Sequence, residues 1–300
     1  MSTWTRFSWS AWSLRTRVLL LSSLAMHALG IGLIIGGHIA LGIGVVVLDH
    51  AKYFWGSLWP HSRVLGPVLR RLPIKTKEVW LTIDDGPSAD TSALLDLLDA
   101  HAARATFFLV GERAEAMPER VREIVARGHT IGNHTQRHLS AWFWAIGPQR
   151  MREEIGRAQA TLTRLAGAPP HWFRAVAGMA NPFVAPALVA HGLRRVSWSA
   201  RGFDAVDGNT HRVFARLARG IAPGAILLLH EGGPDSVVLM TRVLDELNVR
   251  GYRAVLPEDM QSVADAATIA AIPAAAAISA ATISSPAGDQ QPVVERRATP

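Results

Sequence analysis

The sequence predicts an α/β fold, a distorted (β/α)7-type barrel that follows an N-terminal transmembrane helix. Short apolar runs alternate with longer helix-like stretches between residues 77 and 262, as in parallel strands joined by right-handed crossovers. Six or seven such units in about 185 residues fit one barrel better than two open sheets. Ionisable residues follow several of the apolar runs, and barrels collect their reactive groups at the carboxyl ends of strands.

The strands are expected in short runs of apolar, β-favouring residues, and the helices in the longer stretches between them. The strand-like runs cover residues 79–83, 105–110, 195–198, 225–229 and 252–255, with weaker candidates at 130–131 and 172–173. The helix-like stretches cover residues 91–101, 118–127, 149–165, 182–191, 211–219 and 236–250.

An uncharged segment at residues 18–48 contains no Asp, Glu, Lys or Arg. A bilayer crossing needs about 20 such residues, and the apolar region of a cleaved signal peptide has only about 7 to 15. The segment therefore predicts an uncleaved membrane anchor with aromatic residues on both flanks. A hairpin that turns at Gly36 and Gly37 is the alternative, but it leaves a second limb of about ten residues, too short to span. We expect a single pass.

Charges near this segment predict its orientation. Arg6, Arg15 and Arg17 precede it, whereas Lys52 and Arg63 are the nearest cations beyond it. The excess before the span favours a cytoplasmic segment at residues 1–17. We expect an anchor in the inner (plasma) membrane, with the barrel domain on its extracytoplasmic side.

The remaining chain divides by composition. Residues 49–76 contain several turn formers and predict a juxtamembrane connector, and residues 77–262 are expected to form the barrel domain. Residues 263–300 are Ala-rich and then polar, which predicts a disordered tail. A second crossing in the tail is disfavoured, because Asp265 and Pro273 interrupt its apolar stretch.

The distribution of the basic residues argues against nucleic acid as a partner. The 300 residues carry a formal net charge of +7 and no cysteine. A basic balance can indicate nucleic acid binding. Here the arginines are scattered through helix-like segments, with no basic run interleaved with aromatic residues, so we expect no nucleic acid partner. A solvated surface near anionic membrane lipids fits this pattern better.

Two adjacent carboxylates, Asp84 and Asp85, end the first strand-like run, before a Gly86-Pro87 turn. Adjacent residues on a strand point to opposite sides. One carboxylate is therefore free to bind a metal while the other accepts a proton. The alternative is a simple turn, with a helix cap at Ser88 or Asp90.

Histidines supply the second half of the candidate site. His134 and His138 are four residues apart, and on a helical turn that spacing puts both imidazoles on one face. Two imidazoles and one carboxylate are a known ligand set for divalent transition metals. His230 follows four aliphatic residues and is expected at a strand end, where a structural core histidine is the alternative. Arg174 and Asp204 lie just past two other candidate strands.

Over residues 78–262 these motifs resemble those of the NodB-homology polysaccharide deacetylases, carbohydrate esterase family 4, whose domain is a distorted (β/α) barrel. The family motif Thr-Phe-Asp-Asp-Gly-Pro is matched at residues 82–87, with Ile83 in place of Phe. His-(Ser/Thr)-x-x-His is matched at residues 134–138. The resemblance implies that Asp84 is the general base. It also implies that Asp85, His134 and His138 hold one divalent metal ion, zinc first, with cobalt, nickel or manganese as alternatives.

The other family motifs are only partly kept. Arg174 is present, but Ala175, Val176 and Ala177 replace Pro-Pro-Tyr, which predicts a smaller and more apolar groove wall. The Trp-x-x-Asp-x-x-Asp-Trp motif retains its first tryptophan and its last aspartate, and its departures are Arg201 and Ala205. The final motif, aliphatic-Leu-His-Asp, is present with Glu231 as its last residue.

The resemblance assigns roles to the residues that are kept. Arg174 would pair with the base, and Asp204 would orient His230, the acid that protonates the departing amine. Trp198 and Leu228 would contact substrate.

The resemblance implies a membrane-anchored, metal-dependent deacetylase that hydrolyses the N-acetyl amide of hexosamines in a polysaccharide or glycan. Its partners would be that glycan and membrane lipid, and the sequence leaves the oligomeric state open. A deacylase of a lipid-linked amino sugar or glycolipid is the main alternative, because the groove is altered and an anchor is present. An inactive sugar-binding domain is a further alternative, although no ligand and no base is missing. Adjacent Asp84 and Asp85 do not suit the separated carboxylates of a glycosidase.

Overall fold

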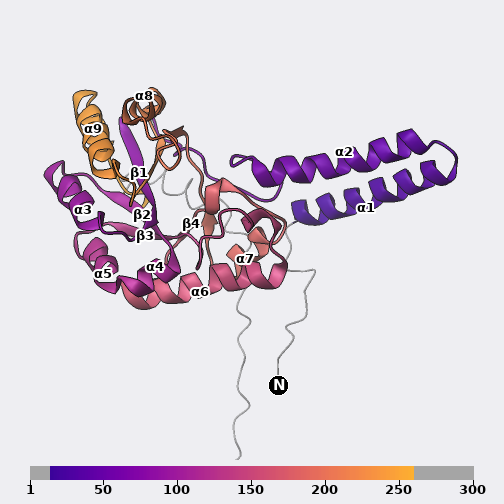
Figure 1. The fold of residues 1–300 in the computed structure, drawn as a ribbon, viewed down its shortest axis with the longest axis horizontal. Coiled ribbons are helices and arrows are strands. Elements are labelled where there is room, and N and C mark those ends of the chain that lie inside the picture. The colour runs from indigo at the N-terminus through magenta and orange to yellow at the C-terminus, as the bar shows by residue number, and fades with distance from the viewer. Residues whose placement is uncertain (1–13, 260–300) are drawn as a thin grey trace, which may run out of the picture.

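The computed structural model describes residues 14–259. The predictions for residues 1–13 and for the tail at residues 263–300 lie outside this range. Within it, a parallel sheet surrounded by helices forms the catalytic domain, and two long N-terminal helices project from one side (Figure 1).

The sheet is parallel throughout, with the order β5-β4-β3-β2-β1-β7-β6, and β8 pairs with β1. This curled parallel sheet confirms the predicted distorted (β/α) barrel. The strands are β1 (Glu78–Gly86), β2 (Ala105–Leu109), β3 (Thr130–Asn133), β4 (Trp172–Phe173), β5 (Arg194–Arg195), β6 (Ala200–Arg201), β7 (Ile226–His230) and β8 (Arg253–Ala254).

The helices lie close to their predicted positions. They are α3 (Thr91–Ala100), α4 (Gly111–Ala116), α5 (Pro118–Ala126), α6 (Pro148–Ala166), α7 (Val184–Ala190), α8 (Thr210–Gly220) and α9 (Ser236–Val249). Sequence analysis did not predict α4 or β6, because six and two residues are too few to display a periodicity. The expected strand at residues 195–198 is reduced to β5.

The alternation along β1 places the candidate base inside the barrel. Val79, Leu81 and Ile83 belong to the main core between the sheet and its helices. Trp80 belongs to a second cluster inside the barrel, packed with Phe108. Because successive strand residues point to opposite faces, the side chain of Asp84 shares the inner face with Trp80.

The predicted continuous helix over residues 18–48 is wrong. The structure has two helices, α1 (Leu14–Ile35) and α2 (Ile39–Leu58), that pack against each other as a hairpin (Figure 1). Gly37 adopts the left-handed conformation (φ 86°), and the amide of His38 donates to the carbonyl of Leu33, as in a glycine-terminated helix. The rejected alternative, a hairpin that turns at Gly36 and Gly37, is therefore the observed one.

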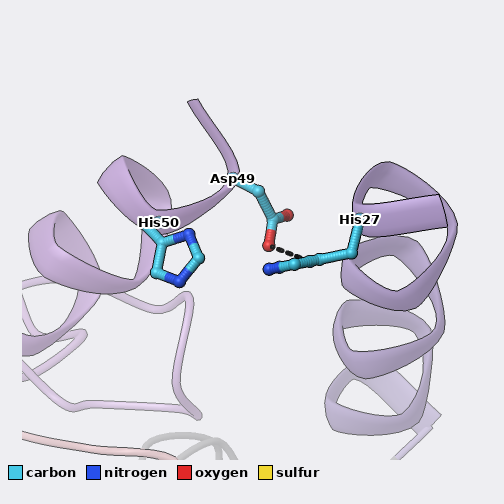
Figure 2. Close-up of side chains that lie close together, drawn as sticks. All are labelled: His27, Asp49 and His50. Carbon is cyan, nitrogen blue, oxygen red and sulfur yellow. Dashed lines mark ion pairs between the residues drawn. The ribbon is translucent and has the colours of Figure 1, made fainter. Parts of the chain in front are cut away.

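The second limb of the hairpin does not end at its first charged residue, as was assumed from the sequence. α2 continues through Asp49 and Lys52, which form an ion pair with 2.5 Å between Nζ and Oδ1. Asp49 is only 1% exposed, and it also accepts a hydrogen bond from Ser23 of α1. Figure 2 shows its carboxylate between the rings of His27 and His50. These polar groups face one another across the hairpin, so their charges do not end the helix.

Glycines allow the two helices to approach closely. A Cβ atom on Gly42 would lie 2.5 Å from the carbonyl oxygen of Gly30, which is closer than real Cβ atoms approach. Most large apolar side chains of both helices are exposed. Both helices are long and apolar enough to cross a membrane, and they are little buried within the protein.

Candidate active site

A bulge at the end of β1 turns both carboxylates toward the same space. The register with β2 pairs Asp84 with Phe108 and then Gly86 with Leu109, so Asp85 is the extra residue. Asp85 has φ of 71°, a left-handed conformation that aspartate tolerates better than most residues. The expectation that the two side chains point to opposite sides is therefore wrong.

The two histidines reach this space from a loop. Sequence analysis expected a helical turn, but residues 134–138 follow β3 in an irregular conformation, and His138 itself has φ of 52°. His134 Nε2 lies 3.5 Å from Asp85 Oδ1, and His138 Nε2 lies 2.9 Å from the same oxygen. The three predicted ligands are thus brought together.

The hydrogen bonds of the two rings set which nitrogens are free. His134 Nδ1 lies 2.8 Å from the carbonyl oxygen of Arg174, which can only accept, so Nδ1 carries the hydrogen. Ser140 Oγ lies 3.1 Å from His138 Nδ1 and donates to the His138 carbonyl, so this Nδ1 also donates. Both Nε2 atoms then present lone pairs.

This donor set fits a divalent cation. Two imidazole lone pairs converge on Asp85 Oδ1, a buried oxygen without a hydrogen-bond partner in the described part of the chain. Three acceptors so close together repel one another unless a cation lies between them. Burial alone raises the pKa of Asp85, but in the absence of a cation protonated His134 and His138 would hold it well below its usual range.

A second group of possible ligands, His27, Asp49 and His50, lies in the hairpin. The ammonium of Lys52 already contacts the Asp49 carboxylate there. A metal ion at that position would face this positive charge, so the site at Asp85 is the better one.

Arg174 is buried beside the candidate base. Its Nη1 donates to Asp84 Oδ1 at 2.6 Å and to Thr82 Oγ1 at 2.8 Å, and its Nη2 donates to the carbonyl of Ser197 at 3.0 Å. The guanidinium stacks on the ring of Phe108, 4.3 Å from the ring centroid. These contacts fix Asp84 Oδ1 and leave Oδ2 facing His134, 3.9 Å from Nε2.

Asp204 orients His230 at the end of β7. One carboxylate oxygen accepts from the backbone amide of His230 at 2.7 Å, and the other lies 3.0 Å from its Nδ1. Within residues 14–259, His230 Nε2 has no hydrogen-bond partner. Burial lowers the pKa of His230, but the hydrogen bond and charge of Asp204, with the charges of Asp84 and Asp85, raise it above its ordinary value.

A cavity of about 590 Å³ opens beside these groups, and Asp85, Asp204 and His230 line part of it. Trp198 and Leu228, the expected substrate contacts, are only 6% and 1% exposed and do not line this cavity.

The segment expected to form a smaller and more apolar groove wall, residues 175–177, is mostly buried. Ala175 and Val176 pack in a core cluster with Leu65 of the connector, and only Ala177 of the three is exposed. Pro60 lies where a Cβ on Gly178 would fall, so the connector occupies the space beside this loop.

Sequence analysis missed the role of Glu231. Its carboxylate accepts hydrogen bonds from Ser88 and Thr91 and lies beneath Gly86, where a Cβ would be 1.8 Å from its Oε1. Burial raises the pKa of Glu231. This residue braces the loop after Asp85, and its position directly after His230 was the available signal. Of the two cap residues considered in the alternative, Asp90 precedes α3 without a side-chain cap bond, whereas Ser88 Oγ accepts from the backbone amide of Asp90 at 3.1 Å.

Comparison with known proteins identifies the family. The family described as Polysaccharide deacetylase matches residues 72–196. A peptidoglycan-N-acetylglucosamine deacetylase of Bacillus cereus is 32% identical over 196 residues, covering 63% of this chain and 70% of the relative. A chitooligosaccharide deacetylase of Bradyrhizobium sp. is 35% identical over 161 residues, covering 53% and 73%.

Comparison with solved structures supports the same family. The Bc1960 peptidoglycan N-acetylglucosamine deacetylase is 31% identical with a TM-score of 0.59, covering 65% of this chain and 93% of that one. A family 4 carbohydrate esterase from Streptomyces lividans is 27% identical with a TM-score of 0.56, covering 62% and 94%. The chain belongs to the polysaccharide deacetylases, carbohydrate esterase family 4. It is a hydrolase that acts on carbon–nitrogen bonds other than peptide bonds.

Proposed function

We propose that the protein removes the acetyl group from an N-acetylated hexosamine in a glycan, with Asp84 as base, His230 as acid and a metal held by Asp85, His134 and His138. The observation that carries the proposal is the convergence of two imidazole lone pairs on the unpartnered oxygen of Asp85, beside Asp84. A divalent metal bound there would act as a Lewis acid toward the amide carbonyl and the attacking water.

The side chains divide the proton transfers between them. Arg174 holds Asp84 Oδ1, so Oδ2 is the atom that accepts a proton from the attacking water. As the carbon–nitrogen bond breaks, His230 gives its Nε2 proton to the leaving amine. Asp204 holds the opposite side of that ring and stabilises its charged form. Water and the amide are converted to a carboxylate and an amine.

Removal of metal tests the assigned ligands. We expect the chelator-treated enzyme to lose acetate release from acetylated chitooligosaccharides, and zinc, cobalt, nickel or manganese to restore it. The reason is that Asp85 lines a cavity and that the ligand set comprises two imidazoles and one carboxylate. If none of the four metals restored hydrolysis in a protein that remains folded, the metal-dependent mechanism would be wrong.

The pH dependence tests the acid. Because Asp204 helps to raise the pKa of His230, the alkaline limb of kcat/KM is expected above the ordinary range of histidine. Asp204→Asn removes the charge and should move this limb to lower pH, because His230 then loses its proton earlier. An unchanged limb in Asp204→Asn, with the maximum rate preserved, would remove His230 from the role of acid.

The hairpin supports a further part of the proposal, a membrane anchor. Its exposed surface is formed by large aliphatic side chains, among them Leu24, Ile35 and Leu48. A soluble helix pair would bury that surface in the protein.

The intact set of ligands and the base argues against the inactive sugar-binding alternative.

A further inference from the structure

The hairpin places both of its ends beside the catalytic domain and its tip away from it (Figure 1). Leu19 of α1 and Tyr53 of α2 pack against the same core cluster of that domain. The helices have 22 and 20 residues. At ~1.5 Å per residue each helix is about 30 Å long, and the part beyond Leu19 and Tyr53 is about 20–25 Å long, so this part crosses the roughly 30 Å of bilayer hydrocarbon where the bilayer is locally thinned. A hairpin that crosses the membrane therefore returns the chain to the side from which it came.

Positive charge is confined to the base of the hairpin. Arg15 and Arg17 lie at the start of α1, and Lys52 lies near the end of α2. No Lys or Arg occurs from residue 18 to residue 51, which includes the whole tip. Cations that flank membrane spans stay in the cytoplasm. Since a hairpin puts all of them on one side, the base is assigned to the cytoplasmic side.

A basic cleft adds further positive charge next to the base of the hairpin. It has a volume of about 440 Å³ and is lined by His61, Arg63, Arg70 and Arg71 with two uncharged residues. All three arginines are exposed, and His61 follows the end of α2 by three residues. The cytoplasmic leaflet carries anionic lipids, which attract such clusters next to a span.

The base of the hairpin also contacts the loop that carries Arg174. The amide of Ala180 donates to the carbonyl of Ser57 in α2 at 2.9 Å. His61 Nδ1 lies 2.9 Å from Ser197 Oγ, and the carbonyl of Ser197 accepts from Arg174. One residue thus links the connector to the guanidinium that holds Asp84. The active site is fixed close to the point where the chain leaves the lipid.

We infer that the hairpin crosses the plasma membrane with both ends in the cytoplasm, and that the active site acts on an N-acetylated amino sugar attached to a lipid of the cytoplasmic leaflet. This inference rests on the proposed deacetylase and names its substrate class. A glycan outside the cell cannot reach a cytoplasmic site, whereas a sugar on a lipid is presented at the height of the hairpin base. The inferred topology places the catalytic domain in the cytoplasm, whereas a single pass was expected to place it on the extracytoplasmic side.

Cysteine labelling tests the topology directly, because the chain contains no cysteine. Ala168→Cys lies exposed after α6, and His38→Cys lies at the hairpin tip. We expect a membrane-impermeant maleimide to label His38→Cys in intact spheroplasts and to label Ala168→Cys only after permeabilisation. The unsubstituted chain supplies the background. Labelling of Ala168→Cys from outside, or of His38→Cys only after permeabilisation, would overturn the inference.

Sealed vesicles test the substrate. Inside-out vesicles that contain the protein are expected to form free amines on extractable glycolipid, and right-side-out vesicles or an Asp84→Asn protein are not. Amines formed only on water-soluble sugars would overturn the lipid-linked substrate. If the solubilised enzyme released acetate from soluble oligosaccharides while Ala168→Cys was labelled from outside, deacetylation would stand and the topology would fall. No acetate from any substrate would instead overturn the proposed function.

Discussion

Asp84→Asn is expected to retain the metal and to lose about 10²–10⁴-fold in kcat, the usual contribution of a general base. Asparagine keeps the shape of the side chain but cannot accept the proton from water. It also leaves the guanidinium of Arg174 without its carboxylate partner in a fully buried position. Loss of one partner of a buried ion pair costs about 3–5 kcal/mol, so a lower Tm should accompany the loss of activity.

Measurement of metal content and Tm separates these effects. Asp96→Asn is the matched control, because Asp96 is 70% exposed and, among the described residues, forms an ion pair with Arg127 alone. That variant should keep its rate, its metal and its Tm. A folded, metal-loaded Asp84→Asn protein with a rate near that of the wild type would show that another group accepts the proton.

His134→Ala is expected to lose both metal and activity. Two remaining ligands, Asp85 and His138, hold a divalent ion poorly, and His138 lies in a loop with a strained backbone. The substitution also removes the hydrogen bond to the Arg174 carbonyl. Metal content after dialysis should fall well below one ion per chain, and the rate should fall with it.

The control for this variant is His171→Ala, which replaces an exposed histidine just before β4. It should retain one metal ion per chain and the rate of the wild type. If His134→Ala kept a full metal ion, the ligand set at the end of β1 would be wrong even if activity were lost.

The barrel and the members of its site could be predicted because they depend on local patterns. β1, β2 and β7 carry apolar runs long enough to be recognised, and β1 and β7 end at or beside residues of the site. The geometry between these residues could not be predicted. Asp84 and Asp85 face the same space only because a bulge adds one residue to β1, and strand alternation alone gives the opposite result.

The hairpin shows a second feature that could not be predicted from the sequence. A charge-free stretch was treated as the whole span, so the segment ended at Asp49. That residue is 1% exposed, paired with Lys52 and contacted by Ser23 from the neighbouring helix. The contact between Ser23 and Asp49 joins residues 26 positions apart, and no local pattern reveals it. The burial of Trp198 and Leu228 likewise depends on distant segments, so the sequence alone does not reveal it.

The most direct test of the account counts both products of the reaction. Metal-loaded enzyme is incubated with an N-acetylated hexosamine oligosaccharide and with the membrane glycolipid extract, and acetate and free amines are measured in the same samples. The account predicts equal amounts of the two products on at least one substrate, formed by the wild type and lost in Asp84→Asn. Acetate without an equal amount of amine, or equal turnover by both proteins, would contradict hydrolysis of an N-acetyl amide at this site.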